Sequence, residues 1–294
     1  MDIKSCELMA RHTFTRTGGA ADLFVQPTTF EEVQQIVTAA KQLHLPITTL
    51  GYGTNVIVRD SGIRGIVMNM NKLDHIQVDN TIITAQSGAS IIQVSRLARD
   101  HHLSGLEFAC GIPGSVGGAL MMNAGAYGGE VSFVLKEATV LDSSGQLLVL
   151  DHTQFNFSYR SSIFEQQHYT VLEAVFELQK AELTAIQSKM DENTMLREQK
   201  QPLEYPSCGS VFKRPPNMFA GKLISDSGLM GTRIGGAEVS TKHAGFIVNV
   251  DQATSTDYLQ LIEHVKQTVW NNYQVRLETE VKIIGDLRDD SLQQ

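Results

Sequence analysis

The segment from Gly105 to Gly129 constrains this chain more than any other feature of its sequence. It holds 8 of the 24 glycines within 25 residues, with apolar side chains and Asn123 between them and almost no charge. Glycine adopts positive φ readily and lets a ligand approach the bare backbone. Successive N–H groups in such turns can hold anionic oxygens. The segment is too apolar for a solvated linker, so it favours a buried phosphate-binding loop; a set of tight turns between strands is the alternative.

A second, shorter glycine loop, Gly51–Asn55, follows a predicted strand. The chain has no G-x-x-x-x-G-K-[ST] motif, and no G-x-G-x-x-G between a strand and a helix. A P-loop enzyme and a Rossmann dinucleotide-binding unit are therefore disfavoured. Two separate glycine loops suit a long ligand with a pyrophosphate, such as a dinucleotide cofactor.

Composition limits the class of protein. A chain of 294 residues predicts two domains, with one large domain or three small ones as alternatives. Its net charge of −8 lacks the basic footprint of a nucleic-acid-binding protein. Three distant cysteines favour a reducing compartment over a disulfide framework. We see no signal peptide and no apolar run long enough to span a membrane, so we expect a cytoplasmic protein.

The periodicity predicts an α+β fold, because strands are short and no long βαβ alternation occurs. Helices are expected at residues 30–43, 90–102, 181–201 and 257–273. Strands are expected at residues 47–50, 56–58, 65–70, 75–78, 81–85, 137–142, 147–150, 171–178, 245–250 and 275–284.

Three motifs resemble those of one flavoenzyme family. They are Thr17-Gly18-Gly19-Ala20-Ala21, then Leu50-Gly51-Tyr52-Gly53-Thr54-Asn55-Val56-Ile57-Val58, then Gly111-Ile112-Pro113-Gly114-Ser115-Val116-Gly117-Gly118-Ala119 with Asn123-Ala124-Gly125-Ala126. Over about residues 11–285 the chain resembles the UDP-N-acetylenolpyruvoylglucosamine reductase family, in its compact type II branch. The resemblance implies NADPH-dependent, FAD-mediated reduction of UDP-N-acetylglucosamine enolpyruvate to UDP-N-acetylmuramate in peptidoglycan synthesis, and so a role in cell wall biogenesis, cell shape and cell division.

The resemblance also implies the domains. Residues 1–180 would form an FAD-binding domain of the vanillyl-alcohol-oxidase (PCMH) type, in lobes of about 1–66 and 67–180. Residues 181–294 would bind substrate, and the strand 275–285 would bring Glu280 to the active site. NADPH and substrate would use one site in turn, and no obligate protein partner and no metal are expected.

The resemblance implies that FAD is bound without a covalent bond, because the first glycine loop lacks the His that attaches flavin in some members of the wider fold. The implied cofactor-binding residues are Gly51, Tyr52, Gly53, Thr54, Asn55, Gly111, Pro113, Gly114, Ser115, Gly117, Gly118, Asn123 and Gly125.

Three residues match the family's catalytic motifs. Hydride would pass from NADPH to FAD, and then from flavin N5 to the vinyl carbon C3 of the substrate. Ser210, in Gly-Ser-x-Phe-Lys, would protonate C2, and Arg160, in Tyr-Arg-x-Ser, would hold the carboxylate. Strand alternation places Glu278, Glu280 and Lys282 on one face and cannot choose between the glutamates; the family's Glu-Val-[Arg/Lys] ending selects Glu280.

Substrate anchoring has a weaker signal. The resemblance indicates Tyr127, Lys213, Arg214 and Lys282 as substrate contacts. Between Tyr205 and Gly245 there are five Lys and Arg residues against two acids, which fits either anion binding or a solvated face. Two other functions stay open: an FAD oxidase of the same fold that acts on a sugar or hydroxy acid, and a non-catalytic nucleotide-sugar-binding protein.

Overall fold

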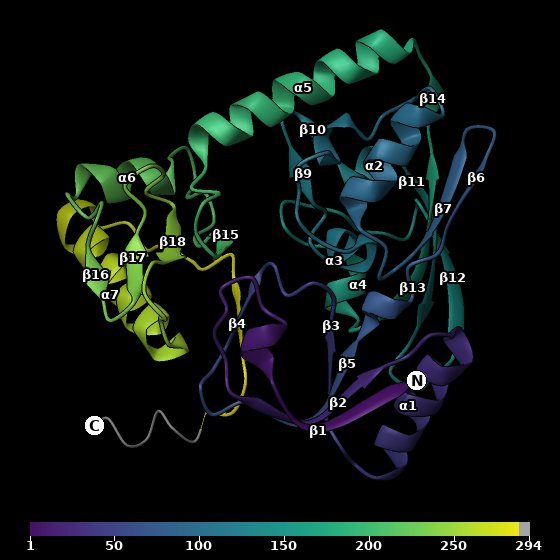
Figure 1. The fold of residues 1–294 in the computed structure, drawn as a ribbon, viewed down its shortest axis with the longest axis horizontal. Coiled ribbons are helices and arrows are strands. Elements are labelled where there is room, and N and C mark those ends of the chain that lie inside the picture. The colour runs from purple at the N-terminus through teal and green to yellow at the C-terminus, as the bar shows by residue number, and fades with distance from the viewer. Residues whose placement is uncertain (288–294) are drawn as a thin grey trace. The chain divides into compact units, whose positions relative to one another are not determined.

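A computed structural model describes residues 1–287, and its contacts divide the chain into two compact units (Figure 1). Unit 1 comprises Met1–Lys4, Phe24–Tyr52 and Gly65–Arg197. Unit 2 comprises Ser5–Leu23, Gly53–Arg64 and Glu198–Gln294. This division differs from the expected boundary at residue 180 in two ways. Two early segments, Ser5–Leu23 and Gly53–Arg64, belong to unit 2, and residues 181–197 belong to unit 1 because they pack on residues 107–110.

The larger sheet of unit 1 has five antiparallel strands. In spatial order they are β12 (Leu147–Asp151), β11 (Leu135–Leu141), β13 (Thr170–Glu177), β7 (Ile82–Gln86) and β6 (Ile76–Asp79). Ala138, Ala174 and Ala85 lie opposite one another across three strands. These small side chains leave room on the inner face for helices.

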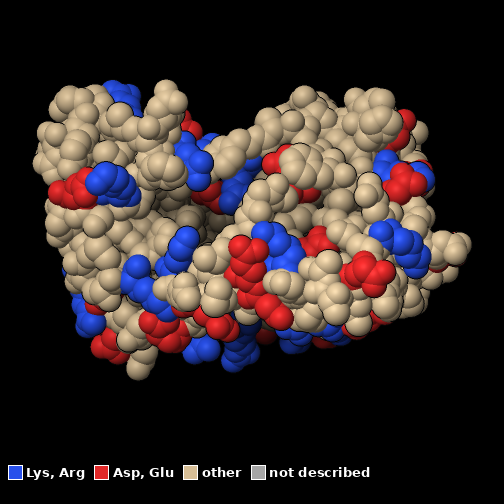
Figure 2. All heavy atoms as spheres, turned by 90° about the horizontal axis from the view of Figure 1, so that it is seen from above, with Lys and Arg blue, Asp and Glu red and all other residues tan. Residues whose placement is uncertain are grey.

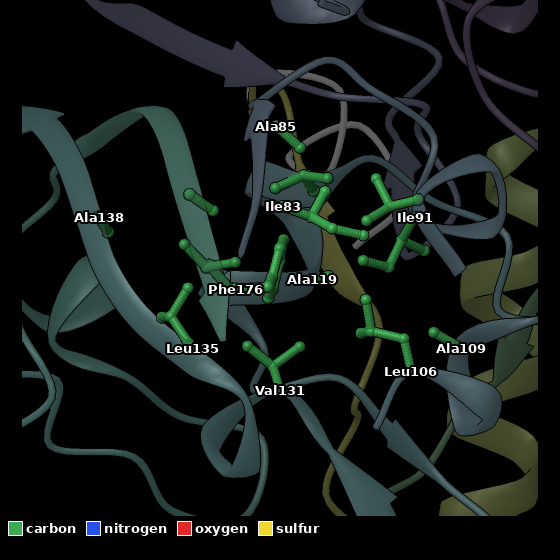
Figure 3. Packing of buried hydrophobic residues seen from close by; sticks show 14 of the residues in the cluster. Ile83, Ala85, Ile91, Leu106, Ala109, Ala119, Val131, Leu135, Ala138 and Phe176 are labelled. Carbon is green, nitrogen blue, oxygen red and sulfur yellow. The ribbon is translucent and has the colours of Figure 1, made fainter. Parts of the chain in front are cut away.

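Two helices belong to the same core as the inner face of this sheet. They are α2 (Ile91–Asp100) and α3 (Val116–Met121). Figure 3 shows Ile83 and Phe176, from the sheet, together with Ile91, Leu106 and Ala119 in one cluster. Ile83, Ile91, Leu106 and Phe176 are fully buried. Full burial of each large apolar side chain contributes about 1.5–3 kcal/mol.

A second sheet has the strand order β1 (Asp2–Leu8), β2 (Ala20–Gln26), β5 (Ile63–Asn69) and β3 (Ile47–Leu50). Helix α1 (Phe30–Gln42) precedes β3, and the Thr29 side chain caps it by accepting from Glu32 N. Strand β3 pairs in parallel with β5, and the chain leaves β3 directly into the loop Gly51–Asn55.

Helix α5 (Leu183–Lys200) is the long helix at the top of Figure 1. It is polar on most of its surface, and its buried residues are Ile186, Met190 and Asn193. Asn193 donates its amide to Glu107 O at 3.0 Å, and Cys110 packs with Ile186 and Met190. One face of α5 thus rests on the chain just before Gly111. The shorter elements of unit 1 are β8 (Leu103–Ser104), β9 (Gly125–Ala126), β10 (Gly129–Glu130), α4 (Ile163–Gln166) and β14 (Gln179–Lys180).

Unit 2 is built on a four-stranded antiparallel sheet. Its strands, in order, are β15 (Ser207–Ser210), β18 (Phe246–Asn249), β17 (Ala237–Val239) and β16 (Arg233–Ile234). Helices α6 (Ala220–Asp226) and α7 (Ser255–Tyr273) share its core. Near the C-terminus, β19 (Lys282–Ile284) pairs in parallel with β4 (Val56–Val58).

The expected helices at 30–43, 90–102, 181–201 and 257–273 are confirmed within two residues at each end. The expected strand 275–284 is wrong over most of its length, since only Lys282–Ile284 form a strand. Within residues 1–287, no helix combines the length and the hydropathy that crossing a bilayer requires.

Candidate functional site

The two glycine segments meet in unit 1. A Cβ atom built on Gly51 would lie 2.2 Å from Ser115 Oγ, so only glycine permits this approach. Asn69, at the end of β5, donates its amide to Gly51 O at 2.9 Å and fixes the end of the loop. The sequence analysis did not identify Asn69, which is fully buried in the structure.

The loop after Gly51 presents backbone donors. Among the described residues, the N–H groups of Tyr52, Gly53, Thr54 and Asn55 form no hydrogen bond to a protein acceptor. Gly53 has φ +67, and its carbonyl accepts from Phe14 N at 3.0 Å. Partial burial raises the pKa of Tyr52, and Asp74 adds to that effect.

The second segment turns into α3 at Ser115. The Ser115 hydroxyl accepts from Gly118 N at 3.2 Å, and Gly117 N donates to Ser87 O at 2.8 Å. Gly111, Pro113 and Gly114 are half-buried, and Gly118 is exposed. Ser87 Oγ is buried and, within residues 1–287, has no hydrogen-bond partner.

Close packing against protein atoms accounts for several glycines that the sequence reading ascribed to a ligand. A Cβ atom on Gly117 would lie 3.0 Å from Ser87 Cβ, one on Gly125 2.8 Å from Glu130 Cβ, and one on Gly129 2.7 Å from the Phe108 ring. The glycine count alone is therefore weaker evidence for a ligand than the sequence suggested.

Tyr127 lies at the tip of the β9–β10 hairpin, with Gly128 beside it. Both have positive φ, +53 and +86, as a tight hairpin turn requires. At the base of the hairpin, Asn123 donates to Glu130 Oε1 at 3.0 Å and accepts from Ser132 N at 3.0 Å. The Asn123 amide, which we expected to bind cofactor, thus supports the hairpin.

Arg160 lies in a turn closed by reciprocal 3.1 Å hydrogen bonds between Ser158 and Ser161. Its φ of +56 lies in the left-handed region that few non-glycine residues adopt. The next residue but one, Ser162, donates its hydroxyl to Met121 O at 2.9 Å. The turn is therefore anchored to the end of α3, and its strained backbone is typical of functional positions.

Ser210 ends a bulged strand in unit 2. Ser207 pairs with Val248 and Ser210 with Phe246, so β15 carries one extra residue. Gly209 takes the bulge conformation, with φ +76. Ser210 itself is half-buried. The bulge aims a side chain that regular pairing would direct elsewhere.

Glu280 lies beside the same segment. Glu280 N donates to Val211 O at 2.8 Å, and Lys213 N donates to Glu278 O at 2.9 Å. Glu280 is 9% exposed, whereas the Glu278 side chain is 75% exposed. Residues 278–280 pair antiparallel with residues 211–213 around an isolated bridge between Phe212 and Thr279, and burial distinguishes the two glutamates.

Asn55 connects the first glycine loop to this segment within unit 2. Its side-chain amide donates to Glu280 O at 3.3 Å, and Lys282 N donates to Asn55 O at 3.0 Å. The Asn55 side chain, expected to touch cofactor, thus holds the backbone of Glu280.

Cys208 lies two residues before Ser210 and is fully enclosed. Burial raises the pKa of its thiol to about 12, and the nearby Glu280 carboxylate adds to that effect. A thiol with such a pKa stays protonated near neutral pH and is inert as a nucleophile. Its role is to fill space in the core of unit 2.

The positive charges expected to bind substrate are mostly paired. Lys213 Nζ lies 3.4 Å from Glu278 Oε2, Lys222 pairs with Asp226 at 2.8 Å, and Arg233 with Glu238. Arg214 stacks over Phe219, and Lys282 is exposed. Figure 2 shows blue and red residues interspersed over the face in view. Three of the five basic residues between 205 and 245 are thus paired with carboxylates.

Arg197 is a residue that the sequence analysis missed. A Cβ atom on Gly111 would lie 2.9 Å from Arg197 Cδ, and the positive charge of Arg197 opposes the rise in the pKa of Tyr127 that burial causes. Among the described residues, the half-buried guanidinium has no hydrogen bond or ion pair. It sits at the end of a polar helix, where a sequence pattern cannot distinguish it from a solvated arginine.

The donor set fits a dinucleotide cofactor such as FAD. The unpaired N–H groups of residues 52–55 suit phosphate oxygens, and the orphaned Ser87 hydroxyl lies against Gly117 of the second segment. Gly51 and Ser115 bring the two segments together. Among residues 1–287, no group of three or more His, Cys, Asp or Glu side chains is placed to hold a metal ion.

Unit 1 thus holds Gly51, Tyr52, the second glycine segment, Tyr127 and Arg160. Unit 2 holds Gly53, Thr54, Asn55, Ser210, Lys213, Arg214, Glu280 and Lys282. Within unit 2, the structure brings Ser210 and Glu280 onto adjoining segments.

Comparison with known proteins gives matches over both parts of the chain. Residues 21–151 match the family model described as FAD binding domain, and residues 201–284 match that of the UDP-N-acetylenolpyruvoylglucosamine reductase C-terminal domain. The expected α+β class, with an FAD-binding domain before a C-terminal domain, is confirmed.

Individual relatives cover nearly the whole chain. UDP-N-acetylenolpyruvoylglucosamine reductase 2 of Bacillus cereus strain ATCC 14579 is 57% identical over 97% of this chain and 93% of its own. The Listeria innocua reductase is 58% identical over 97% and 95%. The crystal structure of the Thermus caldophilus reductase is similar with a TM-score of 0.84 and 30% identity, over 96% of this chain and 99% of that one.

Proposed function

Since the chain belongs to the UDP-N-acetylenolpyruvoylglucosamine reductase family, we propose that it reduces UDP-N-acetylglucosamine enolpyruvate to UDP-N-acetylmuramate, with FAD as cofactor and NADPH as reductant. In general terms, the chain is an FAD-dependent oxidoreductase of peptidoglycan synthesis. One observation supports the specific reaction most strongly: Ser210 and Glu280 lie on adjoining segments that are joined by backbone hydrogen bonds.

Ser210 is proposed as the proton donor to C2 of the enolpyruvyl group. A serine hydroxyl is a weak acid, but the carbanion equivalent that develops at C2 is a strong enough base to take its proton. The bulge at Gly209 supports this role, because it fixes the direction of a half-buried hydroxyl. Glu280, buried beside Val211, is proposed to orient the groups around that proton.

Arg160 is proposed to hold the substrate carboxylate. A guanidinium can donate two parallel hydrogen bonds to a carboxylate and stabilises the negative charge that develops on the carboxylate. The closed turn and its anchor on Met121 support a fixed backbone from which the guanidinium extends. Tyr127, Lys213, Arg214 and Lys282 are proposed as further substrate contacts.

The residues proposed to hold FAD are the two glycine segments: Gly51, Tyr52, Gly53, Thr54 and Asn55, then Gly111, Pro113, Gly114, Ser115, Gly117, Gly118 and Gly125. Asn123 is proposed to help hold FAD indirectly, because its side chain supports the β9–β10 hairpin. When bound, FAD supplies the hydride for the vinyl carbon and takes it beforehand from the reductant.

FAD is expected to be released intact when the protein is precipitated with acid. The loop Gly51–Asn55 contains no His that could form a covalent bond to flavin. The measurement is the flavin absorbance of supernatant and pellet. Colour that stays in the pellet after washing would show a covalent bond and contradict the expectation.

Steady-state kinetics are expected to be ping-pong, with inhibition by excess substrate, if NADPH and the enolpyruvyl substrate bind in turn. Initial rates at several fixed NADPH concentrations should give parallel lines in a double-reciprocal plot. Intersecting lines would indicate that both ligands bind together, and that sequential use of one site is wrong.

The activity itself is tested by the product. Purified protein with NADPH and UDP-N-acetylglucosamine enolpyruvate should form a product heavier by two hydrogens, measured by mass spectrometry. UDP-N-acetylglucosamine, which lacks the enolpyruvyl group, is the control and should stay unchanged. Oxygen consumption with sugars or hydroxy acids, and no reduction of the enolpyruvyl compound, would instead support an oxidase.

A further inference from the structure

A buried loop of three threonines lies in unit 2. Thr13, Thr15 and Thr17 are 7%, 0% and 2% exposed. Thr13 Oγ1 donates to Thr17 O at 2.8 Å and accepts from Thr17 N at 3.2 Å, and the hydroxyls of Thr15 and Thr17 are 2.9 Å apart. Side-chain hydrogen bonds, rather than a helix or strand, therefore give this threonine loop (Thr13–Thr17) its conformation.

The threonine loop supports the first glycine loop. Phe14 N donates to Gly53 O at 3.0 Å. A Cβ atom built on Gly53 would lie 2.1 Å from His12 O and 3.0 Å from Thr13 Cα. Gly53 thus rests directly on the chain entering the threonine loop, and a shift of that loop would displace Gly53 and the donors next to it.

Asn249 joins the threonine loop to the sheet of unit 2. Its Nδ2 donates to Thr15 O at 2.9 Å, and its Oδ1 accepts from Ala253 N at 2.8 Å. Asn249 ends β18, which pairs with β15, and Asn249 N donates to Pro206 O at 2.9 Å. Asn249 is 9% exposed. Its carboxamide therefore links β18, the partner strand of β15 and Ser210, to the threonine loop on which Gly53 rests.

We propose that Asn249 is a positioning residue for the cofactor loop, acting through Thr15 and the threonine loop. The inference rests on the proposed FAD site, but it concerns a residue that touches neither cofactor nor substrate. Only a side chain with a donor and an acceptor satisfies both Thr15 O and Ala253 N. Aspartate has the shape of asparagine and keeps the acceptor, but it places an oxygen against Thr15 O.

Asn249→Asp is the discriminating variant. It should raise the FAD dissociation constant by about tenfold, the effect of losing one buried hydrogen bond and leaving Thr15 O unsatisfied. In FAD-free protein, amide hydrogen exchange at Phe14 and Thr17 should become faster in this variant. The control is Val265→Ala. Val265 lies on α7 in the core of unit 2, so its truncation should lower the free energy of unfolding while FAD affinity stays within about twofold.

A double-mutant cycle tests the route. Thr17→Val keeps the shape but removes the hydroxyl that bonds to Thr15. If Asn249 acts through the threonine loop, Asn249→Asp and Thr17→Val together should weaken FAD binding by less than the product of their separate factors. Val265→Ala combined with Asn249→Asp should give the plain product.

The outcomes are separable. An Asn249→Asp protein that binds FAD like wild type, with unchanged exchange at Phe14 and Thr17, would overturn the proposal. If Asn249→Asp and Val265→Ala both lost FAD affinity in proportion to their lost stability, the proposal would also be overturned, since Asn249 would then be merely structural. Wild-type protein that binds no FAD would instead refute the proposed cofactor site.

Discussion

Ser210→Ala is expected to be reduced by NADPH at a nearly normal rate, while its reoxidation by the enolpyruvyl substrate slows by about 10²–10⁴-fold. No proton is delivered to carbon when NADPH is consumed, so the hydroxyl matters only in the second half-reaction. Stopped-flow absorbance, with each half-reaction followed separately, measures both rates.

Two controls accompany this variant. Ser207→Ala removes a hydroxyl from the same strand, on a residue that is also half-buried, and should leave both half-reactions within a few-fold of wild type. Ser210→Cys should retain part of the activity, because a thiol can also give a proton. Reoxidation of Ser210→Ala within a few-fold of wild type would remove Ser210 from the mechanism and point to an ordered water.

Gly53→Ala is expected to weaken FAD binding by about 10- to 100-fold or more. Its φ of +67 strains any other residue, and the added methyl would lie 2.1 Å from His12 O, a backbone atom that cannot turn aside. Overpacking of this kind costs about 1–3 kcal/mol, and each 1.4 kcal/mol is about tenfold in affinity. Fluorescence titration of the FAD-free protein with FAD gives the dissociation constant.

Gly228→Ala is the matched control. Gly228 has φ +72, close to that of Gly53, but no atom lies within 4 Å of its built Cβ. It should show the cost of backbone strain without the clash and bind FAD like wild type. Equal losses of FAD affinity in the two variants would mean that strain in unit 2, rather than the position of the loop, governs binding.

The sequence predicted those helices that are defined by a capping residue and by regular apolar spacing. The helix expected at residues 30–43 lies within one residue of α1 at each end, because a local cap at Thr29 and the helical spacing of Val33, Ile36 and Val37 define it. Helix α3 was missed because two of its six residues are glycines, which have poor helix propensity. It forms because the Ser115 cap and burial of Val116 and Leu120 outweigh that propensity.

The candidate site depended on contacts between distant segments, which a sequence pattern does not specify. Alternation could not separate Glu278 from Glu280, because their different burial depends on packing against distant parts of the chain. The excess of Lys and Arg between residues 205 and 245 gave no sign that Glu278 would neutralise Lys213. Asn249 carried no signal, since its partner Thr15 lies 234 positions earlier in the chain.

The central claim is that electrons pass from NADPH through FAD bound to this chain to the enolpyruvyl substrate. The most direct test is an anaerobic titration of the purified protein with one equivalent of NADPH and then one of UDP-N-acetylglucosamine enolpyruvate, followed by its visible spectrum. The account predicts that NADPH bleaches the flavin band, and that substrate restores it with formation of an equal amount of UDP-N-acetylmuramate. A band that NADPH bleaches but only oxygen restores would contradict it.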